Sequence, residues 1–310
     1  MNPTLVLGHL NPDTDTTGSA IAYAWYLSTQ KNMPAEAAVT GQLNKETLFV
    51  LEYFKIAAPR LITELTTEDN FVLVDTNNPD ELVSGHEKAN LLEVVDHHKL
   101  VGGLHTSQPI SFTLRPVACT CTVLADIMKG VELPREIAGV MLACILSDTL
   151  NFSSPTTTEQ DRAVAQSLIA QTGIDPDELA QEMFAAKSDL SGLFPQDIVT
   201  FDSKIYPIGD KKVRISVVET TLPAKALEIR QELEKALKES KENDGLAGAF
   251  LFIVNIITGN ATLIVPSDDE RHIAETAFKV SFTGETVELP GIVSRKKQMA
   301  PFIENAFNQS

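Results

Sequence analysis

The sequence predicts an α/β protein with an N-terminal parallel-sheet domain, helices on both faces of that sheet, and a smaller C-terminal α/β domain. Three observations lead to this prediction. Short apolar segments typical of buried strands alternate with helical segments in the first half of the chain. A small, polar segment that contains glycine follows at residues 188–193. The chain has 310 residues, which is more than most single domains contain.

The first domain is expected to span residues 1–187 and to contain three buried strands that each run into a polar loop. These strands are predicted at residues 4–8, 71–74 and 91–95. A helix capped by threonine or serine is predicted after the first strand, over residues 20–27. The later part of the domain has helical periodicity at residues 137–145, 161–169 and 177–184.

The second domain is expected to span residues 194–310, after a linker at residues 188–193. Its pattern begins with two strand-like segments and continues with a helix rich in Glu and Lys. Two further apolar strands flank Thr258-Gly259-Asn260, which is typical of a hairpin turn. The predicted elements are strands at residues 198–208 and 213–218, a helix at 224–240, and strands at 249–257 and 261–265.

The composition argues against several classes of protein. Asp and Glu number 42 against 25 Lys and Arg, and the resulting net charge of −17 disfavours a general nucleic-acid binder, which needs a basic surface. No apolar run approaches the ~18 residues needed to span a bilayer. The first ten residues lack Lys and Arg, and three cysteines cannot form a disulfide framework, so we expect a cytoplasmic protein without membrane contact. The pair Cys119 and Cys121 is interpreted as packing at a helix start.

Acidic and imidazole side chains follow each of the three predicted strands of the first domain. They are His9, Asp13 and Asp15 after the first strand, Asp75 after the second, and Asp96, His97 and His98 after the third. Because the carboxyl ends of parallel strands line one edge of a sheet, we expect these side chains to converge. Asp148, just past a predicted helix, could join them.

The expected cluster combines carboxylates with imidazoles, which suits Mn²⁺, Co²⁺, Fe²⁺ or Zn²⁺, whereas an all-oxygen set would favour Mg²⁺ or Ca²⁺. With four aspartates and two histidines, one aspartate could bridge two ions ~3.5–4 Å apart, as in two-metal hydrolytic sites. Any one of these residues could instead be a turn or capping residue. Three such clusters after three apolar strands favour a metal site.

The same residues carry a resemblance to a known family. The segments His9-x-Asn11-Pro12-Asp13-x-Asp15, Val74-Asp75-x-Asn77 and Asp96-His97-His98 resemble the motifs of the DHH phosphoesterase superfamily. The segment Ser294-Arg295-Lys296-Lys297-Gln298 is similar to the signature of its family II (manganese-dependent) inorganic pyrophosphatases. The resemblance spans nearly the whole chain and implies a DHH domain followed by a DHHA2 domain.

The resemblance also implies a role for each candidate site residue. One metal would be held by His9, Asp13, Asp75 and Asp148, and the other by Asp15, Asp75 and His97, so that Asp75 bridges the two ions. His98 would face the substrate phosphate, and Asp96 would orient a neighbouring imidazole. Lys204, Arg295 and Lys296, all in the second domain, would hold the far phosphate.

The activity implied by the resemblance is the hydrolysis of inorganic pyrophosphate to two phosphates, at an active site between the two domains. Two Mn²⁺ ions per subunit would bind, Co²⁺ could substitute for them, and Mg²⁺ would enter with the substrate. A hydroxide bridging the two metals would be the nucleophile, because metal binding lowers the pKa of water toward ~7. The family further implies a homodimer.

Three alternatives remain open at this point. Other DHH phosphoesterases act on short oligonucleotides or on 3′,5′-bisphosphorylated adenosine, but they typically carry a Gly-Gly-Gly-His motif that residues 194–310 lack. Exopolyphosphatases share the second-domain type and differ in the chain length of their substrate. A regulatory protein could use the same site to sense phosphate or a metal without turnover.

Overall fold

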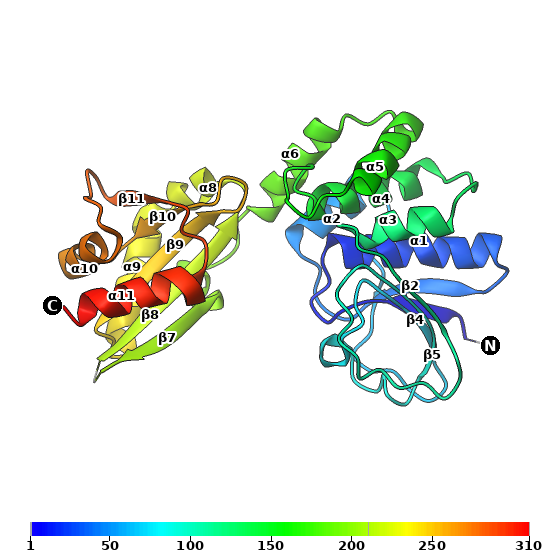
Figure 1. Ribbon diagram of the computed structural model, residues 1–310, viewed down its shortest axis with the longest axis horizontal. Helices are drawn as coiled ribbons and strands as arrows, with labels where there is room; N and C mark the ends of the chain where they lie inside the picture. Colours follow the sequence, from blue (N-terminus) through cyan, green and yellow to red (C-terminus); the bar gives the residue numbers. More distant parts are fainter. Residues whose placement is uncertain (1, 210, 310) are drawn as a thin grey trace. The chain divides into compact units, whose positions relative to one another are not determined.

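The chain forms two units, each built around its own sheet, in a computed structural model that describes residues 2–209 and 211–309. The first unit ends at Ala186 and the second begins at Lys187. Figure 1 shows both sheets with their helices. The predicted α/β class is confirmed, since one unit has a parallel six-stranded sheet and the other has a smaller sheet of five strands. Among the described helices, none is both long and apolar enough to cross a lipid bilayer.

The sheet of the first unit has the strand order β3-β2-β1-β4-β5-β6, with every neighbouring pair parallel. Its strands are β1 (Thr4–Leu7), β2 (Ala35–Val39), β3 (Arg60–Leu61), β4 (Asn70–Val74), β5 (Asn90–Asp96) and β6 (Ser111–Leu114). The chain passes from β1 through β2 to the edge strand β3, and from β4 through β5 to the opposite edge strand β6. The order therefore reverses between β1 and β4, and in open α/β sheets ligands bind at the carboxyl ends of strands beside such a reversal.

The α-helices of this unit pack over one face of the sheet. They are α1 (Thr14–Gln30), α2 (Lys45–Tyr53), α3 (Thr120–Ile127), α4 (Arg135–Asp148), α5 (Glu159–Thr172) and α6 (Pro176–Lys187). Their buried side chains form one core with Val6 of β1, with Val72 and Val74 of β4, and with Val95 of β5. Alternate residues of the same strands point to the opposite face.

The two faces of this sheet are covered differently: the described α-helices lie over one face, whereas helices were predicted on both. The opposite face, which carries Leu7 and Phe71, is covered by loop residues such as Leu65 and Leu82 and by the three-residue helix η1 (Pro79–Glu81). Right-handed crossovers that run from β4 to β5 and β6 must pass over this face. Proline and several glycines with positive φ interrupt these connections, so they form loops.

The second unit has a mixed sheet in the order β11-β10-β9-β8-β7, in which β8 and β9 are parallel and the other neighbours are antiparallel. The strands are β7 (Ser203–Ile208), β8 (Lys211–Thr220), β9 (Gly248–Asn255), β10 (Asn260–Ile264) and β11 (Thr286–Pro290). The helices are α7 (Pro195–Phe201), α8 (Pro223–Glu228), α9 (Arg230–Asn243), α10 (Asp268–Phe278), η2 (Arg295–Met299) and α11 (Ala300–Phe307). Two apolar cores lie on the two faces of this sheet, one with α10 and α11 and one with α7 and α9.

Two elements of the second unit differ from the prediction. The first four residues of the predicted strand at residues 198–208 belong to helix α7, because Pro195 starts a helix whose Ile198 and Val199 are buried in the core that contains Leu233 and Leu237 of α9. The single helix predicted over residues 224–240 is divided into α8 and α9. The predicted hairpin is confirmed, since β9 and β10 are antiparallel and Gly259 adopts a φ of 70° in the connecting turn.

Candidate metal centre

The carboxyl ends of β1, β4 and β5 bring acidic and imidazole side chains together, as parallel pairing requires. His9 follows β1, Asp75 follows β4, and His97 and His98 follow β5. The amino end of α1 adds Asp13 and Asp15, and the last residue of α4 adds Asp148. These seven residues fall into groups whose potential ligand atoms lie within 4.8 Å of one another.

Asp75 lies at the centre of this cluster and is 2% exposed. Its Oδ2 accepts a hydrogen bond from Thr16 Oγ1 at 2.5 Å and lies 3.5 Å from Nε2 of His9. Its Oδ1 accepts a hydrogen bond from Thr120 Oγ1 at 3.0 Å and lies 3.3 Å from Nε2 of His97. The two oxygens of one carboxylate therefore face two different histidines, which is the arrangement that a bridging ligand needs.

The backbone of Asp75 is left-handed, with a φ of 61°, immediately after a buried strand. This conformation is uncommon for a residue other than glycine, although Asp tolerates it better than most. The hydrogen bond from Asp75 N to the carbonyl of Val95 at 3.0 Å secures it against β5. Such local strain often accompanies a functional position.

His9 and Asp13 form one group with Asp75. Nε2 of His9 lies 3.7 Å from Oδ2 of Asp13. The other oxygen of Asp13 caps helix α1 by accepting a hydrogen bond from Thr16 N at 2.9 Å. Asp13 therefore caps the helix, which was its alternative interpretation, and it also lies in a position suitable for a metal ligand.

Asp148 lies with Asp15 and His97, and these three residues form another group of potential ligands. This differs from the resemblance-based grouping, which placed Asp148 with His9 and Asp13. The reason is the packing of α4 on α1, which sets where the last residue of α4 lies. His97 donates from Nδ1 to the carbonyl of Val117 at 3.0 Å, which leaves Nε2 available to a metal.

Asp15 is held by the first turn of helix α3. It is 1% exposed and accepts hydrogen bonds from Thr120 N at 2.6 Å and Cys121 N at 3.2 Å. Ser19 Oγ and Cys119 Sγ donate to its Oδ1 at 2.9 and 3.0 Å. The supporting roles of Thr16 and Thr120 were not predicted from the sequence. The only available signal is that each lies one residue from a cluster member or a cysteine.

His98 is supported by the buried Asp96. Nδ1 of His98 lies 2.9 Å from Oδ1 of Asp96, and that hydrogen bond raises the pKa of His98. Asp96 also accepts hydrogen bonds from the backbone N–H groups of both histidines and from Asn77. His98 is half exposed and, together with His9, lines a cavity of about 350 Å³. It can therefore contact a molecule that enters from solvent.

The electrostatics of the cluster favour a bound cation. Burial, followed by the charge of Asp75, raises the pKa of Asp15, and burial followed by the charge of Asp15 raises the pKa of Asp148. Four carboxylates therefore crowd one site, and divalent cations relieve the repulsion between them. Mixed carboxylate and imidazole donors suit Mn²⁺, so the residues present fit that ion.

Binding of Mn²⁺ should release protons near neutral pH. Burial lowers the pKa of His9, but hydrogen bonds to Asp13 and Asp75 outweigh it and raise the pKa to about 10. The pKa of His97 rises to about 9 in the same way, with Asp75 as its main partner. Both imidazoles hold a proton at neutral pH without metal and must lose it to bind one.

The proton release can be measured with a pH indicator during Mn²⁺ titration of metal-stripped protein in weak buffer. The number of protons released should fall as the pH rises through about 9 and then about 10, since the imidazoles are then already neutral. Release that stays constant across that range would contradict the assignment of these two histidines as ligands.

The predicted substrate residues of the second unit lie on β7 and η2. Lys204 is exposed on β7, and Arg295 and Lys296 begin η2. Arg295 donates from Nη1 to the carbonyl of Asp202 at 2.8 Å and contacts its Oδ1 at 2.6 Å. This ion pair holds the guanidinium of Arg295 beside Asp202, which lies two positions before Lys204 in the chain.

Gln298 fixes the loop that precedes Arg295. Its Oε1 accepts hydrogen bonds from Val293 N at 3.0 Å and Ser294 N at 2.9 Å, while its Nε2 donates to the carbonyl of Gly291 at 2.7 Å. The following turn, η2, is a π-helix, and such turns are frequent at functional sites. The last side chain of the Ser-Arg-Lys-Lys-Gln segment therefore holds the loop that leads into it.

Comparison with known proteins places both units in known families. Residues 3–145 match the DHH family, N-terminal domain, and residues 181–306 match the DHHA2 domain. Proteins of Bacillus anthracis and Bacillus cereus (strain B4264), each named "Probable manganese-dependent inorganic pyrophosphatase", are 40% identical to this chain over 310 residues. Each match covers 99% of this chain and 99% of the relative.

Two solved structures are also similar to this chain over nearly its whole length. A Methanococcus jannaschii protein assigned to the family II inorganic pyrophosphatases is 34% identical, with a TM-score of 0.64 and coverage of 98% of this chain and 99% of that chain. An exopolyphosphatase-related protein from Bacteroides fragilis is 13% identical with a TM-score of 0.51, covering 99% of this chain and 92% of its own, and shares the fold.

Proposed function

The chain belongs to the manganese-dependent, family II inorganic pyrophosphatases, and on this premise we propose that it hydrolyses inorganic pyrophosphate to two phosphate ions. It is then an inorganic diphosphatase, a hydrolase that acts on a phosphoric anhydride bond. The observation that carries the proposal is the buried carboxylate of Asp75, whose two oxygens face His9 and His97 separately. Such a carboxylate can bridge the two ions of a binuclear hydrolytic site.

In this proposal two Mn²⁺ ions bind per subunit. His9, Asp13 and Asp75 would hold one, and Asp15, Asp75, His97 and Asp148 would hold the other. When bound, such ions lower the pKa of water and offset negative charge on phosphoryl oxygens. Co²⁺ suits the same donors and could replace Mn²⁺, while Mg²⁺ would accompany pyrophosphate, since Mg²⁺ is commonly bound through substrate phosphates.

His98 is proposed to contact the phosphoryl group under attack. Its hydrogen bond to Asp96 favours the protonated imidazole, because the carboxylate stabilises the positive charge. A protonated ring that donates from Nδ1 to Asp96 keeps Nε2–H for a phosphate oxygen. His98 would thereby stabilise the negative charge that develops as water adds to phosphorus and the bridging P–O bond breaks.

The second unit is proposed to supply the positive charges for the other phosphate. Lys204, Arg295 and Lys296 are the candidates, with residues 1–187 acting as the metal-binding domain, 188–193 as a linker and 194–310 as the substrate-binding domain. Arg295 can grip a phosphate through several N–H groups at once, whereas a lysine acts as a point charge. The active site would then lie between the two domains and close around the substrate.

The first test is phosphate release from pyrophosphate by metal-stripped protein to which Mn²⁺, Co²⁺, Zn²⁺ or Mg²⁺ is returned. We expect strong turnover that Mn²⁺ or Co²⁺ restores best. Tripolyphosphate, a short oligonucleotide and 3′,5′-bisphosphorylated adenosine are assayed in parallel as alternative substrates. Preference for tripolyphosphate would favour an exopolyphosphatase, activity only on the last two would favour another phosphoesterase, and no turnover at all would favour a sensor of phosphate or metal.

The cellular setting is part of the same proposal. We propose a cytoplasmic protein that binds neither nucleic acid nor membrane, because a net charge of −17 disfavours nucleic-acid binding and the three cysteines are buried and free, as is usual in a reducing compartment. The proposed homodimer rests on the family resemblance. Sedimentation analysis of the purified chain tests the dimer, since a monomer at all accessible concentrations would exclude it.

A further inference from the structure

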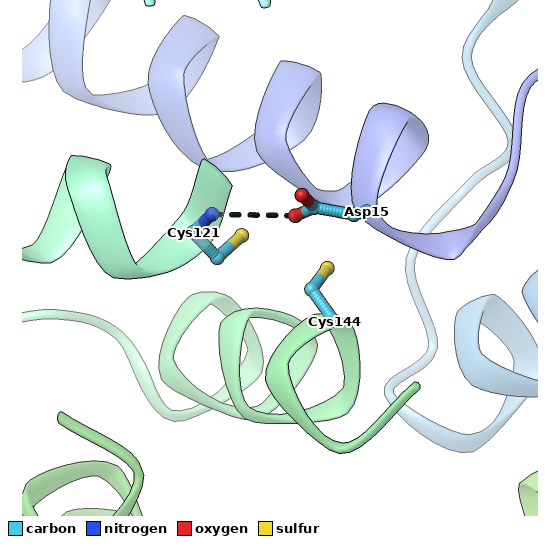
Figure 2. A group of neighbouring side chains, drawn as sticks. All are labelled: Asp15, Cys121 and Cys144. Atoms are coloured by element: carbon cyan, nitrogen blue, oxygen red, sulfur yellow. Dashed lines mark hydrogen bonds between the residues drawn. The ribbon is translucent and has the colours of Figure 1, made fainter. Parts of the chain in front are cut away.

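Two thiols from different helices face the buried carboxylate of Asp15. Cys121 lies in the first turn of α3 and Cys144 lies in the last part of α4, and neither is exposed to solvent. Figure 2 shows both sulfur atoms pointing into the space between α1, α3 and α4, toward Asp15. The two Sγ atoms and one carboxylate oxygen of Asp15 all lie within 4.8 Å of one another. From the sequence, Cys119 and Cys121 were interpreted as packing at a helix start; the proximity of Cys144 to Cys121 is a finding of the structure.

The surroundings of the two thiols are polar for so deeply buried a position. Sγ of Cys121 lies 3.2 Å from Oγ of Ser19, and Sγ of Cys144 lies 3.2 Å from the carbonyl of Thr14. A Cβ on Gly18 would lie 2.2 Å from Sγ of Cys144, so this thiol can lie against α1 only because residue 18 is glycine. The helices thus leave room for this sulfur beside the amino end of α1.

This donor set differs in kind from that of the manganese centre. Thiolates select soft or borderline ions such as Zn²⁺, whereas carboxylates, imidazoles and water suit Mn²⁺. Zn²⁺ binds sulfur at about 2.3 Å, so two sulfurs on a tetrahedral ion lie about 3.8 Å apart. The observed separations are within 4.8 Å, so a small shift of two side chains would form such a site.

We propose that Cys121, Cys144 and Asp15 form a site for a thiophilic divalent cation, with Zn²⁺ as the expected ion. Two S–H bonds break and two metal–sulfur bonds form when the ion binds, and the two protons pass to solvent. The site shares Asp15 with the group that contains His97 and Asp148. A thiophilic ion therefore competes with Mn²⁺ for Asp15, although its other ligands are distinct.

The test uses Co²⁺ as a spectroscopic probe on the metal-stripped full-length chain. Co²⁺ bound to cysteine gives an intense sulfur-to-metal charge-transfer band in the near ultraviolet, and Co²⁺ bound only to aspartate and histidine does not. We expect this band in the wild-type protein. It should develop slowly, because the ion must reach a site enclosed by three helices.

Three variants and one control variant assign the band to its ligands. Cys121→Ser and Cys144→Ser should each weaken the band strongly, and the double variant should lose it. Cys119→Ser is the matched control: this residue is equally buried and its sulfur also contacts Asp15, but it is outside the proposed ligand set. Near-ultraviolet circular dichroism of each variant verifies that it is folded. A wild-type protein without the band, or a band that survives in the double variant, would overturn the proposal.

A competition experiment tests the sharing of Asp15. Preloading with excess Mn²⁺ should reduce the charge-transfer band at a fixed Co²⁺ concentration, and Zn²⁺ should abolish it. A band that Mn²⁺ leaves unchanged would show that the thiol site does not use Asp15 and would overturn the proposed ligand set. Because these readouts measure no turnover, they remain informative whether or not the chain hydrolyses pyrophosphate.

Discussion

Replacement of Asp75 by asparagine should eliminate most metal binding and strongly lower kcat for pyrophosphate. The decrease in kcat should exceed the about 10³-fold decrease that follows the loss of a single charge-stabilising group. Asparagine keeps the size of the side chain and tolerates the left-handed backbone found at this position. The substitution therefore removes the charge without straining β4. It also leaves His9 and His97 without the carboxylate that lies 3.5 and 3.3 Å from their Nε2 atoms.

The measurement combines the manganese content per chain after gel filtration with the rate of phosphate release. Asp269→Asn is a matched control, because it makes the same chemical change at an exposed aspartate of helix α10. The control should retain both metal and activity. If Asp75→Asn retained two metal ions per chain and near-normal turnover, Asp75 could not be the bridging ligand.

Much of the candidate metal centre was predictable because it depends on strand ends. His9, Asp75 and His97 each follow an apolar segment, and parallel strands bring such positions to one edge regardless of the details of the fold. The reversal of strand order between β1 and β4 places His9 beside Asp75, and nothing local in the sequence specifies that order.

The position of Asp148 shows where prediction from sequence ends. It lies at the end of a helix, so its neighbours depend on how α4 packs against α1, which involves residues more than one hundred positions away. The same holds for Thr120, whose hydroxyl orients Asp75 from the start of α3. Hydroxyl residues are common at helix starts, so the sequence alone could not distinguish a supporting residue from an ordinary capping residue.

The differences between the predicted and the observed fold also arise from packing between distant segments. The segment at residues 198–208 is rich in β-branched residues, which favour strands, yet Ile198 and Val199 are buried in a helix that packs on α9. Tertiary packing overrode local preference there. The loops that cover one face of the first sheet contain Gly85, Gly102 and Gly103 with positive φ, a signal that argued against helices on that face.

Replacement of Arg295 by alanine should lower kcat/KM for pyrophosphate about 10- to 100-fold, mainly through a higher KM, and should leave manganese binding unchanged. Hydrogen bonds to a charged group contribute about 1.5–3 kcal/mol, and each 1.36 kcal/mol is a factor of about ten. The guanidinium contacts Asp202 through Nη1. Since an arginine has five N–H donors, the rest can hold a phosphate while this contact fixes the side chain.

Two further variants separate the geometry of Arg295 from its charge. Arg295→Lys keeps the charge but loses the planar fork, so its loss should be intermediate. Lys297→Ala removes an exposed positive charge two positions along the same turn, to which no role in the site is assigned, and should have little effect. Steady-state kinetics with metal analysis distinguishes the cases. If Arg295→Ala and Lys297→Ala behaved alike, the turn at η2 would contribute only general positive charge, and Arg295 would have no specific role in binding pyrophosphate.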